Sequence, residues 1–259
     1  MKTSTKLIAL AIGTSVLASQ AMARDAVGPG DKDSRWIVGA GVNTSSNLYA
    51  GEDDDTSLYP NFRYNGERFF VKDGTLNLHV LQNGAFSYGF TLAPSGTLLS
   101  DESEYKDNDK LAGLMEREYT VEGGIYMNHT TDMGRLNLTL GTDLGNEHKG
   151  HTALASYTFD LRAGDWYINP RIGVAWMSEH KAQHFFGVSQ VEATDSREAY
   201  NADSNFNVFA GVRGRYELTD KWDINLETGV VALGDGIKDS SIVDEDYIYN
   251  ASVGVSYSF

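Results

Sequence analysis

Histidine pairs are the residues of this chain whose spacing is closest to that of metal ligands. His180 and His184 stand four residues apart, which on a helix places both imidazoles on one face, and His148 and His151 lie close together beside an acidic residue. A zinc site needs three or four ligands. Neither histidine pair belongs to an HExxH motif, and neither has a third ligand at the sequence spacing typical of zinc sites. We therefore expect no metal site and no cofactor.

Nucleophilic catalysis is the second chemistry to consider. The chain has no cysteine, so it has neither a thiol nucleophile nor a disulfide framework. A serine nucleophile needs a histidine base within hydrogen-bond reach, but neither His79 nor His129 has a suitably placed serine in a nucleophile motif. The sequence thus predicts no catalytic residues, and we expect that the protein is not an enzyme.

Acidic residues gather in three stretches, from Glu52 to Asp55, from Asp101 to Asp109 and from Asp235 to Asp246. Clusters of carboxylates can bind Ca²⁺ or Mg²⁺, here between the protein and the phosphates of lipopolysaccharide, but we favour a solvated charged surface. The formal net charge is −15. It argues against a nucleic-acid partner, because binding to phosphate backbones needs a basic face.

A second set of charges lies inside stretches that alternate between apolar and polar residues. In a strand, alternate residues share one face, so these charges point away from the apolar face. Two interpretations stay open: a network of ion pairs that braces and plugs a narrow interior, or a charged lining that selects solutes in a channel. The predicted lumen-lining residues are Arg63, Glu122, Arg135, Asp160, Arg162, Arg171, Arg213, Arg215, Glu217, Asp223 and Glu227.

Alternation with a period of two residues dominates from Trp36 onward and predicts strands. The clearest stretch begins at Trp166 and ends at Trp176, and both indoles fall on its apolar face. Ten residues of tilted strand span roughly 26 Å, close to the height of the apolar band of an outer-membrane barrel between its aromatic girdles. The pattern therefore predicts an all-β fold, an antiparallel transmembrane β-barrel of the outer-membrane type.

About twelve strands are predicted. They cover residues 35–45, 56–65, 67–72, 75–82, 85–94, 117–129, 133–142, 152–162, 165–177, 204–218, 221–233 and 246–259. The connections alternate between short and long, and the long ones are 46–55, 95–116, 143–151, 178–203 and 234–245; the exception is the very short connection after Lys72. Short periplasmic turns and long outer loops are typical of outer-membrane barrels, so the alternation supports an even number of strands.

Both ends of the chain carry sorting signals. Lys2 and Lys6 precede an apolar run, and Ala21-Met22-Ala23 is an A-x-A cleavage site, as in a secretory signal peptide. We predict cleavage after Ala23, which gives a signal peptide (1–23), a periplasmic leader (24–34) and a barrel (35–259). Tyr257 and Phe259 end an apolar stripe that looks like the C-terminal assembly signal of bacterial outer-membrane proteins. The expected location is the cell outer membrane.

Three stretches resemble the MipA/OmpV family of outer-membrane proteins. The first runs from Trp36-Ile37-Val38-Gly39 to Tyr59-Pro60-Asn61-Phe62, the second holds Gly187, Val188 and Tyr200, and the third holds Gly234, Asp235 and Asp239. The resemblance covers nearly the whole mature chain. It implies an outer-membrane β-barrel without catalytic residues, in which Gly187, Val188 and Tyr200 have a structural role in a loop that folds over the barrel mouth.

The resemblance also implies a function. It implies a scaffold that joins a lytic transglycosylase to a bifunctional peptidoglycan synthase, or else an osmolarity-responsive or adhesive surface protein whose adhesion would use loops 95–116 and 178–203. A narrow porin for small solutes is a further alternative. We expect a monomer whose other partners are the barrel-assembly machinery and the lipid and lipopolysaccharide of the outer membrane.

Overall fold

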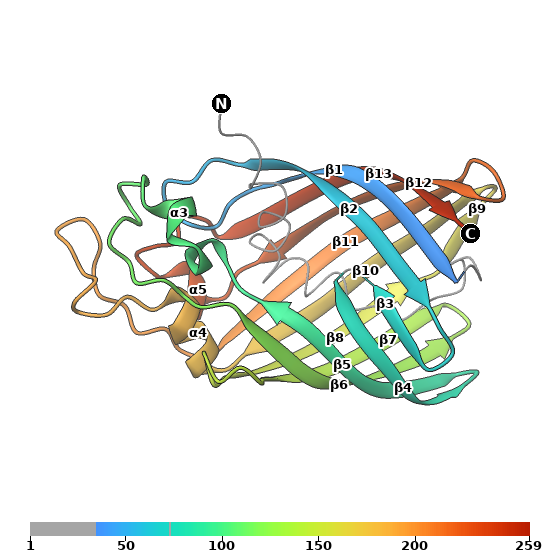
Figure 1. Ribbon diagram of the computed structural model, residues 1–259, viewed down its shortest axis with the longest axis horizontal. Coiled ribbons are helices and arrows are strands. Elements are labelled where there is room, and N and C mark those ends of the chain that lie inside the picture. The colour runs from blue at the N-terminus through green and yellow to red at the C-terminus, as the bar shows by residue number, and fades with distance from the viewer. Residues whose placement is uncertain (1–34, 73) are drawn as a thin grey trace.

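A closed β-barrel is the architecture of this chain (Figure 1). The computed structural model describes residues 35–72 and 74–259, so the predicted signal peptide and leader lie outside the described residues. Thirteen strand segments form one antiparallel sheet, and pairing of β10 with β11 closes it. The segments β8 and β9 pair with β10 in one register on either side of Asp160, so the wall has twelve strands. The predicted fold is confirmed.

The strands follow each other around the wall in chain order, joined as hairpins. Their bounds are β1 Trp36–Ser45, β2 Asp55–Asn65, β3 Phe69–Lys72, β4 Thr75–Asn83, β5 Phe86–Ser95, β6 Thr120–Thr131, β7 Gly134–Asp143, β8 His151–Phe159, β9 Leu161–Ala163, β10 Trp166–Met177, β11 Asn205–Glu217, β12 Trp222–Ala232 and β13 Tyr247–Ser258. Four short helices lie in the long connections: η1 Leu98–Ser100, α3 Glu102–Tyr105, α4 Glu179–Phe186 and α5 Asp235–Lys238.

The wall is apolar outside and mostly polar inside, the reverse of a soluble protein. Along β11, Asn205 and Asn207 are buried in the interior, whereas Phe206 and Val208 between them are more than half exposed on the outer surface. An outward apolar band with a polar interior is what a lipid environment requires of a barrel. No helix among the described residues is long and apolar enough to cross a membrane.

The two ends of the barrel differ (Figure 1). The helices α3, α4 and α5 and the long connections lie at the left end, and the C-terminus lies at the opposite end with the short turns. Short turns mark the periplasmic end in this class of barrel. The left end of Figure 1 is therefore the outer end.

Two predicted strands differ from the structure. The strand predicted at 117–129 begins at Thr120, because Arg117 leaves the wall to form an ion pair with Glu192 at 2.9 Å. The strand predicted at 152–162 is interrupted at Asp160, whose backbone N–H donates to the Met133 carbonyl at 3.1 Å. Pro170 lies in β10 beside this interruption and has no N–H to offer a neighbouring strand.

Candidate functional site: the cap and the barrel interior

The long connections fold together over the outer mouth of the barrel, and we call this region the cap (residues 46–54, 96–119, 144–150, 178–204 and 233–246). A hydrophobic core joins it to the upper wall. Its buried members are Tyr49, Leu99, Tyr105, Leu111, Leu114, Leu154, Met177, Ala182, Phe185, Phe186, Val188, Ala202, Phe209, Val231, Leu233, Ile237, Ile242, Val243 and Ile248. Side chains therefore fill the outer mouth.

A buried ionic cluster fastens α4 to the wall. The Lys181 ammonium of α4 donates a hydrogen bond to the Glu122 carboxylate of β6, and both side chains are only 1% exposed. The same carboxylate lies 3.4 Å from His148 Nε2 and accepts a hydrogen bond from the Thr152 hydroxyl at 3.2 Å. Glu122 is thus a buried interior residue, and two of its partners, Lys181 and His148, come from the cap.

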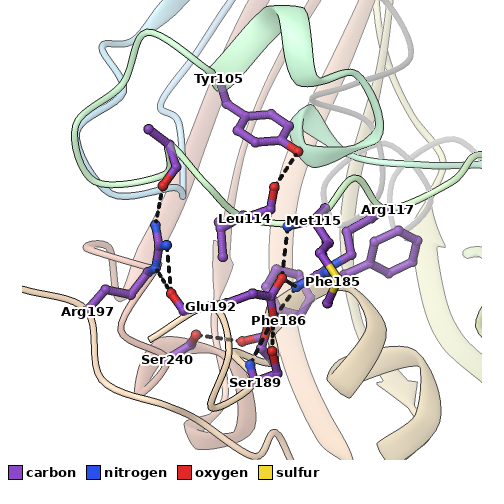
Figure 2. A network of polar contacts seen from close by, with 12 residues as sticks. Tyr105, Leu114, Met115, Arg117, Phe185, Phe186, Ser189, Glu192, Arg197 and Ser240 are labelled. Carbon is purple, nitrogen blue, oxygen red and sulfur yellow. Dashed lines mark hydrogen bonds and ion pairs between the residues drawn. The ribbon is translucent and has the colours of Figure 1, made fainter. Parts of the chain in front are cut away.

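A second polar network joins two loops of the cap (Figure 2). Glu192 forms an ion pair with Arg117 at 2.9 Å and accepts hydrogen bonds from the backbone N–H of Met115 and from the hydroxyl of Ser189. Arg197 donates to the Glu192 carbonyl at 2.7 Å and to the Lys110 carbonyl at 2.7 Å. These contacts hold loops 96–119 and 178–204 together as one unit. Arginine side chains supply the hydrogen-bond donors for carbonyl oxygens of both loops.

Two titratable groups of the cap have pKa values far from their usual range. Burial would raise the pKa of Glu192, but hydrogen bonds from Ser189 and Met115 and the charge of Arg117 outweigh it and lower this pKa to about 2. Burial lowers the pKa of His184 to about 4, helped by the nearby His148 and Arg117. The cap is therefore built around an ionised Glu192 and a neutral His184.

The residues carried over from the family resemblance meet in the cap. Val188 and Tyr200 exchange backbone hydrogen bonds of 2.8 Å in both directions, and the Tyr200 hydroxyl donates to the Asp235 carbonyl at 3.2 Å. A Cβ on Gly234 would lie 2.3 Å from the Phe206 carbonyl, so this position has no room for a side chain. Gly187 ends α4, and Asp239 ends α5.

At least six of the predicted interior charges form cross-strand ion pairs. Ten of the eleven lie at buried or half-buried inward positions, whereas Arg162 in β9 has 61% of its side chain exposed and lies 4.0 Å from Glu217. Cross-strand pairs join Arg213 to Glu227 at 3.1 Å, Arg215 to Asp223 at 3.1 Å, and Arg135 to Asp160 at 3.3 Å.

Two further arginines face inward from the wall. Arg171 is buried, donates to the Ser156 hydroxyl at 3.1 Å and lies over the ring of Phe209. Arg63 is half-buried on β2, across from Ile37 of β1.

The C-terminal residues form part of an aromatic rim at the periplasmic end. The Tyr257 ring lies 5.0 Å from that of Trp222 and 4.9 Å from that of Phe259. The Phe259 backbone N–H donates to the Trp36 carbonyl at 3.0 Å, which joins the last residue of the chain to the first wall strand.

Most of the cap could not be predicted from the sequence. Lys181 falls in the predicted loop 178–203 and Arg117 at the start of the predicted strand 117–129, because nothing local marks a cation that will be buried against a carboxylate many residues away. The only signal was the position of Glu122 near the outer end of its strand, beyond the reach of the wall arginines. Among the described residues no group of three or more His, Cys, Asp and Glu is placed to hold a metal ion.

Comparisons with known proteins agree with this architecture. A family model described as MltA-interacting protein MipA matches residues 38–259. The chain is 27% identical over 260 residues to the outer membrane protein OmpV of Vibrio cholerae, and 25% identical over 256 residues to the MltA-interacting protein of Escherichia coli K12. Both alignments cover 98% of this chain and 100% of the relative.

Proposed function

The chain belongs to the family of the MltA-interacting protein MipA, and from this premise we propose that this outer-membrane barrel is a scaffold for a lytic transglycosylase. The cap is the observation that carries the proposal. A barrel whose outer mouth is filled by an apolar core and buried ion pairs is suited to holding a partner rather than to passing solutes along its axis. A relative named for its interaction with MltA supports the class of the partner.

The partner would bind at the periplasmic end. This end presents five short turns, and three of them carry an aspartate, namely Asp132, Asp165 and Asp220. The predicted leader at residues 24–34, outside the described residues, carries further acids in its sequence. The aspartates of the turns, which also hold Arg68 and Lys221, would attract a basic surface and speed association, with an effect that falls as salt rises. The peptidoglycan synthase would join the complex through the transglycosylase or through the same rim.

A binding measurement with the folded barrel tests the scaffold. The immobilised wild-type protein should bind a purified lytic transglycosylase, and replacing Asp132, Asp165 and Asp220 together by asparagine should weaken binding by about tenfold, mostly through a slower association rate. A matched control replaces three exposed acids of the cap, Asp53, Asp54 and Asp195, and should bind like wild type. No binding by the wild-type barrel would refute the scaffold.

A narrow porin is a second candidate, because some charged pairs of the interior are partly exposed. The side chains of Arg213 and Glu227 are 28% and 25% exposed toward the periplasmic half. If the cap opened, the predicted lumen-lining residues would meet passing ions, and charge rings set selectivity in such pores. Reversing the charge at Arg213 to Glu should then change the reversal potential in a salt gradient; an unchanged reversal potential in a conducting barrel would count against this candidate.

A further inference from the structure

Along most of its length, one side of β2 has no neighbouring strand among residues 35–72 and 74–259. β2 pairs with β1 from Asp55 to Tyr64, but on its other side only Tyr64 and Asn65 pair with β3. The β3–β4 hairpin ends at Lys72 and Thr75 and so fills only the periplasmic part of the wall between β2 and β5 (Figure 1). The β2 edge (Thr56–Phe62) has no strand partner among the described residues, over roughly 16 Å of wall height.

The position of Pro60 shows that the sequence encodes this edge. The Asn65 N–H donates to the Arg35 carbonyl on the β1 side, so the N–H groups of even-numbered residues in β2 point to the other side. Pro60 is an even-numbered residue and has no N–H. The proline thus removes a donor that would have had no strand partner among the described residues.

The inward side chain of Tyr59 in β2 turns away from the β2 edge. A Cβ on Gly41 of β1 would lie 2.7 Å from the ring of Tyr59, and one on Gly254 of β13 would lie 3.0 Å from its hydroxyl. The ring of Tyr59 therefore lies along the closed part of the wall. The inward residues Ser57 and Asn61 of β2 remain partly exposed, unlike the buried inward residues of β6 and β7.

A polar group without a partner lies on the opposite rim. Ser95 faces inward from β5, beyond Leu92, which is the last β5 residue paired with β4. Ser95 is 1% exposed, and its hydroxyl has no hydrogen-bond partner among the described residues. Buried hydroxyls normally find a partner. Leu58 of β2 and Leu92 of β5, beside the tip of the β3–β4 hairpin, are apolar and exposed on the outer surface.

We propose that the wall between the β2 edge and β5 is a lateral opening through which an amphiphile of the outer leaflet, an aliphatic chain with a hydrogen-bonding head, reaches the barrel interior. The depth and the apolar rims fit an aliphatic chain in the membrane. The backbone groups of the β2 edge and the hydroxyl of Ser95 fit a hydrogen-bonding head, because backbone polar groups in lipid need partners. The cap closes the axial route from outside, so the interior is reached sideways. This inference does not depend on the scaffold function.

Single cysteines test the opening, because the described chain and the full sequence contain none. Ser57 and Ser252 both pair with Asn43 of β1, one from each side, so they lie at one depth, and both face inward and are partly exposed. Only Ser57 borders the β2 edge. Ser57→Cys and the matched control Ser252→Cys are folded into lipid bilayers, checked by heat-modifiable gel mobility, and reacted with N-dodecylmaleimide dissolved in the membrane.

The opening predicts that N-dodecylmaleimide labels Ser57→Cys at least about tenfold faster than Ser252→Cys, since only the first borders wall that is open to lipid. Adding Ser95→Ala to Ser57→Cys should slow this labelling severalfold by removing a hydroxyl that binds the head. Equal labelling of the two cysteines by the membrane reagent would overturn the proposal. So would labelling of Ser57→Cys by a small water-soluble maleimide alone, which would show a water-filled defect that lipids do not enter.

Discussion

Single buried charges decide how firmly the cap is attached to the wall. Lys181 and Glu122 have almost no exposed surface, so each depends on the other for compensation. A buried pair adds little net stability compared with an apolar pair of equal size, but loss of one partner leaves a charge in a dry interior. The closed cap therefore requires both members of the pair, and a variant that lacks one of them tests whether the pair holds the cap closed.

Lys181→Met should loosen the cap. The variant leaves the Glu122 carboxylate buried without its main cation, which costs about 3–5 kcal/mol. Protease cleavage within residues 178–204 should become much faster, and the double variant Lys181→Met with Glu122→Gln should recover part of the protection. Lys238→Met is the control, since its ion pair with Asp235 is at the surface; cleavage equal to that of this control would contradict the assignment.

Acid should loosen the cap in two steps. The pKa of His184 is lowered to about 4, so the unfolded loop binds more protons than the folded one below about pH 6.5, and stability falls as pH drops toward 4. The pKa of Glu192 is lowered to about 2, so the stability from its ionised form is complete above about pH 4.5 and is lost toward pH 2. Protease protection measured from pH 7 to 3 should decline, and His184→Gln should remove the upper step only.

At the scale of elements, the strands were predictable and the cap was not. Strand positions follow from a local rule, because lipid outside and polar groups inside impose alternation on every wall residue, as along β10 and β11. Errors occurred where a non-local contact overrode the pattern, as at Arg117, which left the wall for Glu192. The contact between Lys181 and Glu122 depends on how several loops fold together, and no local spacing encodes it.

The cap and the wall should respond separately to mutation. Phe185 is fully buried between α4 and the barrel, so Phe185→Ala should cost the cap about 3–5 kcal/mol through a cavity. The hydrogen bonds of the wall strands do not involve this residue, so the heat needed to unfold the barrel in a gel-mobility assay should stay unchanged while protease cleavage of 178–204 increases. Val191→Ala, at a residue that is 91% exposed, should change neither readout.

At the scale of the whole molecule, assembly should depend on the C-terminal aromatic residue. Phe259 bonds to the backbone of Trp36 and its ring contacts Tyr257, so it closes the periplasmic rim beside the first strand. We expect Phe259→Ala to reduce the amount of folded protein in the outer membrane severalfold, because the exposed ring is the feature that the assembly machinery would recognise. Refolding of the purified variant in detergent should remain normal; a defect there would assign Phe259 to stability instead.

The cap closes the barrel axis, and single-channel conductance tests this closure most directly. Folded wild-type protein in a planar bilayer should be silent, and a variant lacking α4 (residues 179–186) should show discrete current steps, because the helix that carries Lys181 and Phe185 into the mouth is gone. Discrete steps from the wild-type protein, equal in size to those of the α4 deletion, would contradict the claim and favour the porin.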